Sequence, residues 1–275
     1  MLIQPTVRLQ PFGRAVSIFL FGTPENWRFT EPTAKQNILE FAADHGVQTL
    51  YAPDCTTFNA RVLPADAMPR SRAESLSSGR HIAVSSGIQV DGNEIRPREA
   101  LFIATADCPT VCIYDPRTGK LVAAHAGRAS LIDEKALDGG DEREPRSVID
   151  AALALFEARS RLQVFVTCGI RSTNFYHPTD DAKYGDKNRR LLEHIRSSWG
   201  LECTPSALQV GRISLQLIIR AQCIKNGVSP DNIAWDFIDT FDDRDEWHAY
   251  RWWSHRRDGA AGLTGRNGVL VVHHG

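Results

Sequence analysis

The segment that most constrains this fold is a turn-forming run, Asp115-Pro-Arg-Thr-Gly-Lys120, set between apolar runs. Proline presets φ and glycine accepts a positive φ, so this hexapeptide is typical of a tight turn. The run before it covers 101–105 and 110–114, and the run after it covers 121–124. We therefore predict an antiparallel hairpin in which Asp115 faces Lys120.

The register of this hairpin predicts a functional corner. If 116–119 form the loop, paired residue numbers sum to 235, so His125 lies opposite Thr110. Cys108 is then the diagonal neighbour of His125 on the same face, and diagonal Cα atoms lie about 7–8 Å apart. A metal ion or a reacting atom fits between a thiol and an imidazole placed in this way.

Composition excludes several classes of protein. The formal net charge of −1 over 275 residues lacks the basic excess of nucleic-acid and membrane-surface binders. The 6 cysteines form no CxxC pair, and a chain of this length needs no disulfides, so we expect reduced thiols. No apolar run approaches the roughly 20 residues that span a bilayer, and no signal peptide is visible, so we expect a soluble cytoplasmic protein.

Strands and helices mix along the chain, with the hairpin at its centre. This pattern predicts an α/β (α+β) fold, a single domain over 1–275 with mixed sheets flanked by helices. Polar residues 64–80 are expected to form a surface loop. The expected strands are 15–21, 47–51, 81–85, 88–90, 162–167, 233–238, 252–253 and 269–272, and the expected helices are 32–45, 146–160, 181–198 and 215–225.

Three segments resemble one known family. They read TADCPTVCIYD at 105–115, VAAHAG at 122–127 and RWWSHRRDGAAGLTGR at 251–266. They are similar to the laccase-domain family, long called multicopper polyphenol oxidases and now understood largely as zinc-dependent purine nucleoside phosphorylases with adenosine deaminase activity. The resemblance implies the family's fold, which is shared with the catalytic domain of cytotoxic necrotizing factor toxins.

The resemblance also implies site residues. Family members bind zinc through the Cys of TADC, the His of HAGWRG and a His in a QVH segment, which assigns Cys108 and His125 as metal ligands and catalytic residues. Phe58 stands where the first His is expected, and Arg128 replaces the Trp of HAGWRG. His81 is the candidate for a third ligand, because it follows a loop that can fold over the hairpin. The alternatives are an exposed histidine at the start of a strand, with the third ligand supplied by another residue or by the substrate. Zinc is favoured over copper, since the sequence has no multiple-His copper cluster.

The Cys108–His125 pair leaves three alternatives open. Both side chains are suitable zinc ligands, and catalytic zinc typically has three protein ligands and one open position. A thiol nucleophile with an imidazole base is equally compatible with the pair. The third alternative is purely structural, with a buried Cys and a hydrogen-bonded core His. The preserved spacing on a matching motif favours a functional site, and Asp107 is expected to accept backbone N–H bonds or to support a ligand.

Arginines near the C-terminus form a second candidate group. Guanidinium groups bind phosphate through forked hydrogen bonds, which suggests a phosphate site at Arg256 or Arg257, with Arg128 as an additional contributor. Adjacent side chains on a strand point to opposite faces, so only one of Arg256 and Arg257 is expected to face the site. The alternative is a solvated or ion-paired role, given the acidic run 242–246 nearby.

We derive three functional hypotheses. The first is a zinc enzyme that phosphorolyses or deaminates purine nucleosides, with a small-molecule nucleoside and phosphate as its partners and no nucleic acid or membrane. The second is a divergent, metal-free member that acts as a binding or interaction protein. The third is a metal-free Cys–His hydrolase. The sequence indicates neither the nucleoside nor the oligomeric state.

Overall fold

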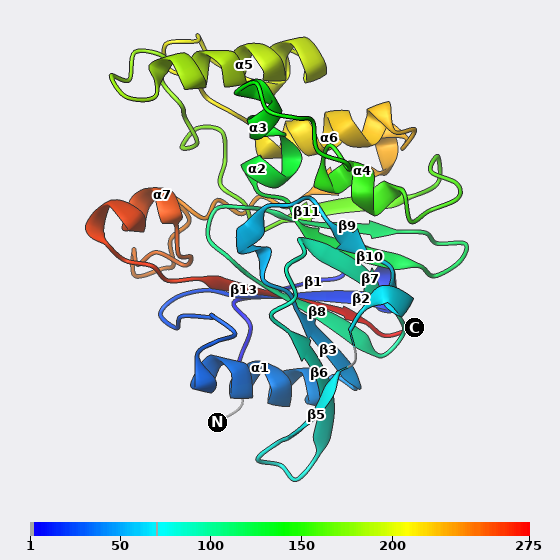
Figure 1. Ribbon diagram of the computed structural model, residues 1–275. Helices are drawn as coiled ribbons and strands as arrows, with labels where there is room; N and C mark the ends of the chain where they lie inside the picture. Colours follow the sequence, from blue (N-terminus) through cyan, green and yellow to red (C-terminus); the bar gives the residue numbers. More distant parts are fainter. Residues whose placement is uncertain (1–2, 70) are drawn as a thin grey trace.

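The computed structural model describes residues 3–69 and 71–275. Figure 1 shows two sheets stacked face to face, with helices over both outer faces. The first sheet has 7 strands in the order β1-β2-β13-β8-β3-β6-β5. Its strands are β1 (Val7–Leu9), β2 (Val16–Phe21), β3 (Thr49–Ala52), β5 (Arg72–Ser75), β6 (His81–Ser86), β8 (Glu99–Thr105) and β13 (Asn267–His273).

The second sheet has 6 strands in the order β12-β11-β9-β10-β7-β4. Its strands are β4 (Val62–Leu63), β7 (Gly92–Ile95), β9 (Thr110–Tyr114), β10 (Leu121–His125), β11 (Gln163–Thr167) and β12 (Ile233–Trp235). Both sheets combine parallel and antiparallel pairs, as in β3·β8 and β13·β8 of the first and β11·β12 and β10·β9 of the second. The expected mixed α/β fold is therefore confirmed.

The helices divide between the two outer faces. Helix α1 (Pro32–Asp44) covers the first sheet, while the remaining long helices lie over the second sheet (Figure 1). These and the short helices are α2 (Arg128–Leu131), α3 (Glu134–Leu137), α4 (Val148–Leu153), α5 (Gly185–Trp199), α6 (Leu215–Lys225) and α7 (His255–Asp258). No helix in the described ranges is long and apolar enough to cross a membrane.

Strand alternation builds three apolar layers. On β10, Val122 and Ala124 pack with α4 and α6, whereas Leu121 and Ala123 pack between the two sheets. Successive side chains of a strand point to opposite faces, so His125 at the strand end shares the inter-sheet side with Leu121 and Ala123. A third layer lies between the first sheet and α1. The sheets are thus buried on both faces, which explains their nearly continuous apolar runs.

The predicted hairpin and its register are confirmed. Leu121 pairs with Tyr114 and His125 pairs with Thr110, so the paired numbers sum to 235 as expected. The turn closes through the Asp115 backbone, whose carbonyl accepts from Gly119 N at 2.9 Å. This register places His125, the last residue of β10, opposite Thr110, the first residue of β9.

The first arm of the hairpin is shorter than the sequence suggests. Segment 101–105 belongs to β8 in the first sheet, whereas 110–114 forms β9 in the second. The chain crosses between the sheets at 106–109, where Asp107 has a φ of 77°. Asp tolerates this left-handed conformation better than most residues, because its short side chain bonds locally. Cys108 therefore lies in the crossover between the two sheets.

Several expected elements need correction. Segment 64–80 contains strand β5 besides its loop, although residue 70 lies outside the described residues. No strand forms at 88–90, because the chain turns tightly there, with Val90 N donating to Ile88 O at 2.9 Å, and β7 begins only at Gly92. Segment 252–253 forms no strand: Trp252 lies in a bend, and α7 follows at His255. The helix expected at 146–160 is only α4, capped at its start by the Ser147 side chain, and α5 begins at 185 instead of 181.

Candidate functional site

His125 and Asp91 form the buried centre of the candidate site. His125 Nδ1 lies 3.3 Å from Asp91 Oδ1, and both side chains are almost fully buried. The Asp91 carboxylate also accepts from Ala60 N at 2.7 Å and from Ser130 Oγ at 2.9 Å. Main chain reinforces the pair, since His125 N donates to Asp91 O at 2.8 Å. These bonds fix the orientation of the imidazole ring, with Nδ1 directed towards the carboxylate.

Cys108 lies on the other side of the same ring. A Cβ atom built on Gly127 would lie 3.1 Å from Cys108 Sγ and 3.3 Å from His125 Nε2, so both atoms border one point. The same Cβ would lie only 2.8 Å from His125 Cε1, a distance that real Cβ atoms essentially never show. Glycine at 127 therefore provides the space in which thiol and imidazole meet. The predicted Cys108–His125 juxtaposition is present.

The neighbours of His125 change the pKa of its imidazole. Burial lowers the pKa of His125, but the charge of Cys108, the hydrogen bond to Asp91 and a hydrogen bond to Cys108 outweigh burial and raise that pKa to about 9. An opposite charge within a few ångströms favours the charged form of a titrating group. The arrangement thus favours the protonated form of His125, between the Cys108 sulfur and the Asp91 side chain.

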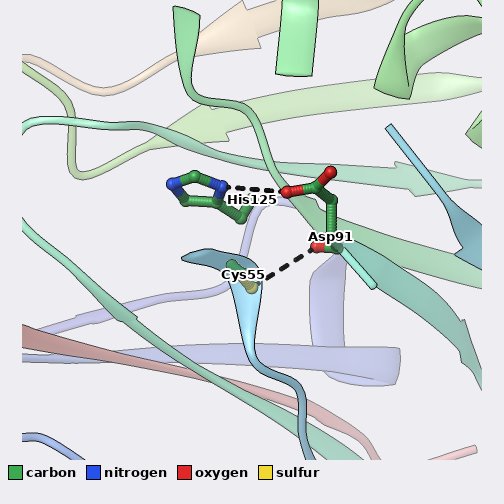
Figure 2. Close-up of side chains that lie close together, drawn as sticks. All are labelled: Cys55, Asp91 and His125. Carbon is green, nitrogen blue, oxygen red and sulfur yellow. Dashed lines mark hydrogen bonds and ion pairs between the residues drawn. The ribbon is translucent and has the colours of Figure 1, made fainter. Parts of the chain in front are cut away.

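A second thiol, that of Cys55, lies on the Asp91 side. Cys55, Asp91 and His125 each offer a ligand atom, and these atoms lie within 4.8 Å of one another (Figure 2). Cys55 Sγ donates to the backbone oxygen of Asp91 at 3.9 Å. Burial and then the charge of Asp91 raise the pKa of the Cys55 thiol well above its usual value. The three residues form a possible metal-binding group.

Phe58 lies beside His125. Its ring centroid lies 5.8 Å from that of His125, and 41% of its surface is exposed. It ends the 3-10 turn at Cys55–Thr57 in a left-handed conformation with a φ of 47°. The Phe58 carbonyl accepts from Arg143 Nη1 at 3.1 Å. The residue at the family's first His position is thus directed to the site, with a phenyl ring in place of a ligand.

The expectation for His81 requires correction. His81 begins β6, which pairs with the edge strand β5 of the first sheet. It is exposed, and its Nδ1 lies 3.2 Å from Ser75 Oγ. Parallel pairing places Ser86, at the other end of β6, beside Ala52, which precedes Cys55. Five residues of strand span about 16 Å, so His81 lies at the wrong end of β6 to join His125. The loop before it forms a hairpin with β6 instead of folding over the site.

Asp107 ties the crossover to the C-terminal segment. Its carboxylate accepts from Arg256 N and from Thr240 Oγ1, each at 2.8 Å. Its backbone oxygen accepts from Ile170 N at 2.9 Å. Only 4% of Asp107 is exposed. The expected structural role is therefore observed, with partners that come from distant segments.

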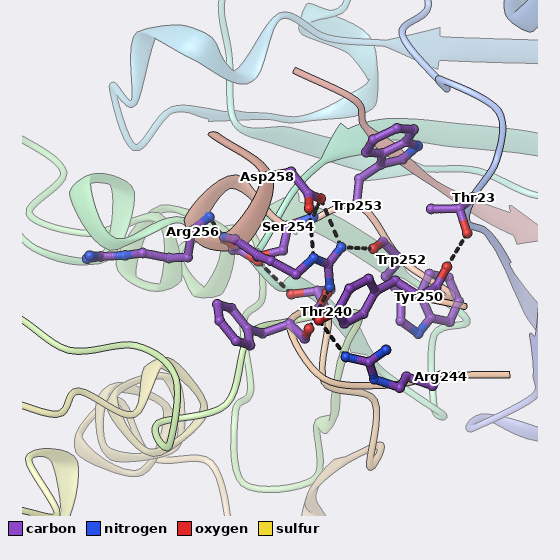
Figure 3. Close-up of polar contacts among 12 residues, drawn as sticks. Thr23, Thr240, Arg244, Tyr250, Trp252, Trp253, Ser254, Arg256 and Asp258 are labelled. Carbon is purple, nitrogen blue, oxygen red and sulfur yellow. Dashed lines mark hydrogen bonds and ion pairs between the residues drawn. The ribbon is translucent and has the colours of Figure 1, made fainter. Parts of the chain in front are cut away.

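Arg256 and Arg257 have different surroundings. Arg257 binds its own segment and the preceding loop. It donates to Trp252 O at 2.7 Å, to both Asp258 oxygens at 2.7 and 2.9 Å and to Phe241 O at 2.5 Å. The Arg256 side chain points away from this cluster (Figure 3). Its Nη2 lies 2.9 Å from His177 Nε2. Since the segment is helix α7, the expected separation of the two arginines arises from a helical turn instead of a strand.

Arg128 meets Arg256 at a common acceptor. Arg128 Nη1 also contacts His177 Nε2, and its Nε donates to Glu134 at 2.6 Å. Because both guanidinium groups are donors only, the shared His177 nitrogen must be unprotonated. Burial, then the charges of Arg128 and Arg256, lower the pKa of His177 to about 2. The three residues line a pocket of about 320 Å³ that also includes Tyr176, Pro178, Asp181, Tyr184, Lys187, Asn188 and Leu191.

Three residues of this region escaped the sequence reasoning. Asp91-Gly92 reads only as a turn signal, and Cys55 reads as one scattered thiol among six. His177 precedes a proline in a segment with no distinctive pattern. Their roles follow from long-range packing: Asp91 reaches His125 across 34 positions, and His177 reaches Arg256 across 79. The TADC and HAG segments are local signals, whereas these contacts have no local signal.

A protein-family model matches most of the chain, including the segments that carry Cys108 and His125. Residues 81–274 match the family model described as multi-copper polyphenol oxidoreductase laccase. The chain belongs to this family. The matched range includes Cys108, His125 and the C-terminal arginines, whereas Cys55 and Phe58 lie before it. No curated protein matches the chain.

Solved structures share the fold over nearly the whole chain. YlmD from Geobacillus stearothermophilus superimposes with a TM-score of 0.64 at 16% identity, covering 100% of this chain and 99% of that one. A Neisseria meningitidis protein gives 0.63 at 17% identity, covering 98% of each chain. The hypothetical protein YfiH from Bacillus licheniformis gives 0.56 at 19% identity, covering 94% and 92%. At these identities the likeness establishes the fold.

Proposed function

We propose that this laccase-domain protein is a purine nucleoside-processing enzyme, acting by phosphorolysis or deamination with zinc at its Cys/His centre. The observation that carries the proposal is the convergence of Cys108 Sγ and His125 Nε2 beside Gly127, in the motifs by which the chain resembles its family. A pocket rich in cations adjoins this centre, because Arg128 follows Gly127 directly and Asp107 holds the Arg256 backbone.

Two donor sets for a metal share His125. One set consists of Cys55, Asp91 and His125, whose sulfur, oxygen and nitrogen donors suit zinc. The other uses Cys108 and His125 Nε2, with Asp91 orienting the ring through Nδ1, as carboxylates commonly do beside histidine ligands. When bound, zinc supplies a Lewis acid and an activated water. The second set has fewer donors than catalytic zinc typically uses, because Phe58 replaces a histidine.

The protein's own residues would bind the phosphate and position the parts of the site. Arg256 and Arg128 would hold the phosphate, since their guanidinium groups already converge on one acceptor. Arg257 is engaged by carbonyl oxygens and by Asp258, so we assign it a positioning role for α7. Asp107 would keep the Cys108 crossover and the Arg256 backbone at a fixed separation.

One observation favours a second candidate, a metal-free thiol hydrolase. Asp91, His125 and Cys108 form a carboxylate–imidazole–thiol series, which is the order of orienting group, base and nucleophile in thiol enzymes. In such an enzyme the Cys108 thiolate would attack a carbonyl carbon, and His125 would protonate the leaving group. Water would then release the acyl group from sulfur. Phe58 favours this candidate, because it removes a metal ligand and leaves the series intact.

Metal content and turnover, measured together, separate these candidates. Purified wild type would be analysed for zinc by mass spectrometry and assayed with adenosine and inosine, with and without phosphate. About one zinc ion per chain with nucleoside turnover, both lost in His125→Ala, is the expected result. Loss in Cys108→Ala or in Cys55→Ala then identifies the donor set.

A control and two contrary outcomes complete the test. His81→Ala changes an exposed histidine at the far end of β6, so it should keep both metal and turnover. Alkylation of Cys108 that depends on His125 in metal-free protein, without nucleoside turnover, would support the hydrolase. Absence of metal, turnover and Cys108 reactivity would contradict both candidates and leave a binding protein.

A further inference from the structure

The pocket around His177 has the features of an anion site. Two guanidinium groups from separate elements, Arg128 of α2 and Arg256 of α7, converge on His177 Nε2. Like charges repel, so their approach needs an acceptor between them, and a neutral imidazole lone pair compensates less charge than an anionic oxygen would. Arg128 is partly neutralised by Glu134, whereas Arg256 has no carboxylate partner among the ion pairs of the described residues.

His177 itself is incompletely satisfied. Only 5% of it is exposed, and its Nδ1 is buried without a hydrogen-bond partner in the described structure. Unpaired buried polar atoms are uncommon in folded proteins and call for an explanation. With Nε2 accepting from the arginines, Nδ1 carries the proton and is a donor. The pocket therefore has an excess of donors over acceptors.

Other side chains line the pocket beside the two arginines. Lys187 adds a third cation, whose Nζ also lies 3.5 Å from Glu134 and 3.4 Å from Asp138. Tyr176 and Tyr184 are about half exposed, at 48% and 49%. The acidic lining residue, Asp181, is engaged, since its carboxylate accepts from the backbone N–H groups of Lys183 and Tyr184 at 2.9 and 2.7 Å. At about 320 Å³, the pocket reaches the size at which organic ligands bind.

We propose that this pocket binds the phosphate group of a phosphorylated nucleoside, with Arg128, His177 and Arg256 around the phosphate and the two tyrosines beside the base. Phosphate oxygens offer the acceptors that the converging donors lack, and forked guanidinium bonds match their geometry. Aromatic rings stack on nucleobases with little sequence preference. The proposal rests on the proposed function in taking the organic part to be a nucleoside, and it gives the phosphate of that nucleoside the two arginines that would otherwise hold inorganic phosphate.

Calorimetric titration with three probes tests the proposal. Adenosine 5′-monophosphate, adenosine and inorganic phosphate would be titrated separately into the metal-loaded wild type and into Cys108→Ala. The monophosphate should bind more tightly than either other probe, and Cys108→Ala should retain this binding, because Cys108 does not line the pocket. Binding of the monophosphate without any nucleoside turnover would support this site while contradicting the proposed function.

Variants locate the phosphate. Arg256→Gln should weaken monophosphate binding by about tenfold or more, the scale of a lost charged hydrogen bond. Lys187→Gln, a change at a more exposed position, should weaken it less, and Arg189→Gln on the same helix should leave it unchanged. Equal binding of inorganic phosphate and the monophosphate would overturn the assignment of an organic ligand. Equal binding of adenosine, or full affinity in both Arg256→Gln and Lys187→Gln, would overturn the site.

Discussion

Asp91 holds His125 from the side opposite Cys108, with 3.3 Å between Oδ1 and Nδ1. The carboxylate is fully buried and is itself held by Ala60 N and Ser130 Oγ. A buried carboxylate with this many donors has a fixed position, so it fixes the ring as well. Both candidate chemistries need that orientation, since it directs Nε2 to Cys108.

Replacing Asp91 with Asn should lower the pKa of His125. Asn keeps the size of the side chain but removes the negative charge that contributes to the pKa of about 9 in wild type. With the carboxylate gone, the burial that opposes ionisation has more weight. NMR titration of the His125 imidazole would measure the shift. An unchanged pKa in Asp91→Asn would show that Cys108 alone sets the charge of the ring, and Asp66→Asn, at an exposed position, serves as a surface control.

Placing a histidine at position 58 should strengthen metal binding. Phe58 has a positive φ that His tolerates better than most residues, and its ring already lies 5.8 Å from that of His125. Phe58→His adds an imidazole ligand beside Cys108 and His125, so zinc affinity should rise by at least about tenfold, the scale on which even outer partners of metal ligands act. Competition with a chromogenic chelator measures the affinity.

The control for this change is Phe58→Leu, which removes the ring without adding a ligand. Both variants should fold, because 41% of Phe58 is exposed and little core packing is lost. Equal zinc affinity in Phe58→His and Phe58→Leu would contradict the geometry inferred for the centre. A metal bound by the protein would then lie on the Cys55 side of His125.

Local signals predicted the centre of this fold well. Turn chemistry at 115–120 and strand alternation determined the register that sets His125 opposite Thr110. The family motifs identified Cys108. The different directions of Arg256 and Arg257 were predicted from strand alternation, but they arise from helix α7. These features depend on residues close in sequence, where propensity and period are informative.

The remaining features depend on how distant segments pack. The change of sheet between 105 and 110 follows a positive φ at Asp107 that no alternation pattern shows. His81 was a plausible ligand by its position after a loop, but β3·β6 pairing carries it to the far end of the sheet. Tertiary pairing also formed β5 within a polar segment of low strand propensity. Contacts across many positions are set by the whole sheet, so sequence reading missed them.

Acid should destabilise the protein through His177. Its pKa is lowered to about 2 in the folded state, while an unfolded histidine titrates near 6.5. Below about pH 6.5 the unfolded chain binds a proton that the folded chain does not, so the free energy of unfolding falls as pH falls. Between pH 6.5 and 5 this single group costs about 2 kcal/mol.

His177→Gln isolates this contribution. Gln offers an acceptor to both arginines without titrating, so its free energy of unfolding should fall less steeply with acid than that of wild type. Urea unfolding at pH 6.5 and pH 5 gives the difference, and His194→Gln on α5 provides a comparison at a less buried histidine. Parallel acid slopes in wild type and His177→Gln would mean that His177 ionises in the folded protein.

Arg256 and Arg257 should differ sharply in their effect on stability. Arg257 donates to Phe241 O at 2.5 Å and to Trp252 O at 2.7 Å, pairs with Asp258, and stacks 3.5 Å from the Tyr250 ring centroid. Removing one partner of a largely buried ion pair leaves the other charge uncompensated. We expect Arg257→Ala to lower the free energy of unfolding by about 3 kcal/mol.

Arg256→Ala should change that free energy by less than about 1 kcal/mol. Its side chain contacts His177 and the Phe175 ring but no carboxylate of residues 3–69 and 71–275, and its removal relieves repulsion with Arg128. The backbone bond from Arg256 N to Asp107, which fixes the segment, is kept. Urea unfolding of both variants at pH 7 makes the comparison. Similar losses in the two would contradict the division between an arginine that holds the fold and one that faces the pocket.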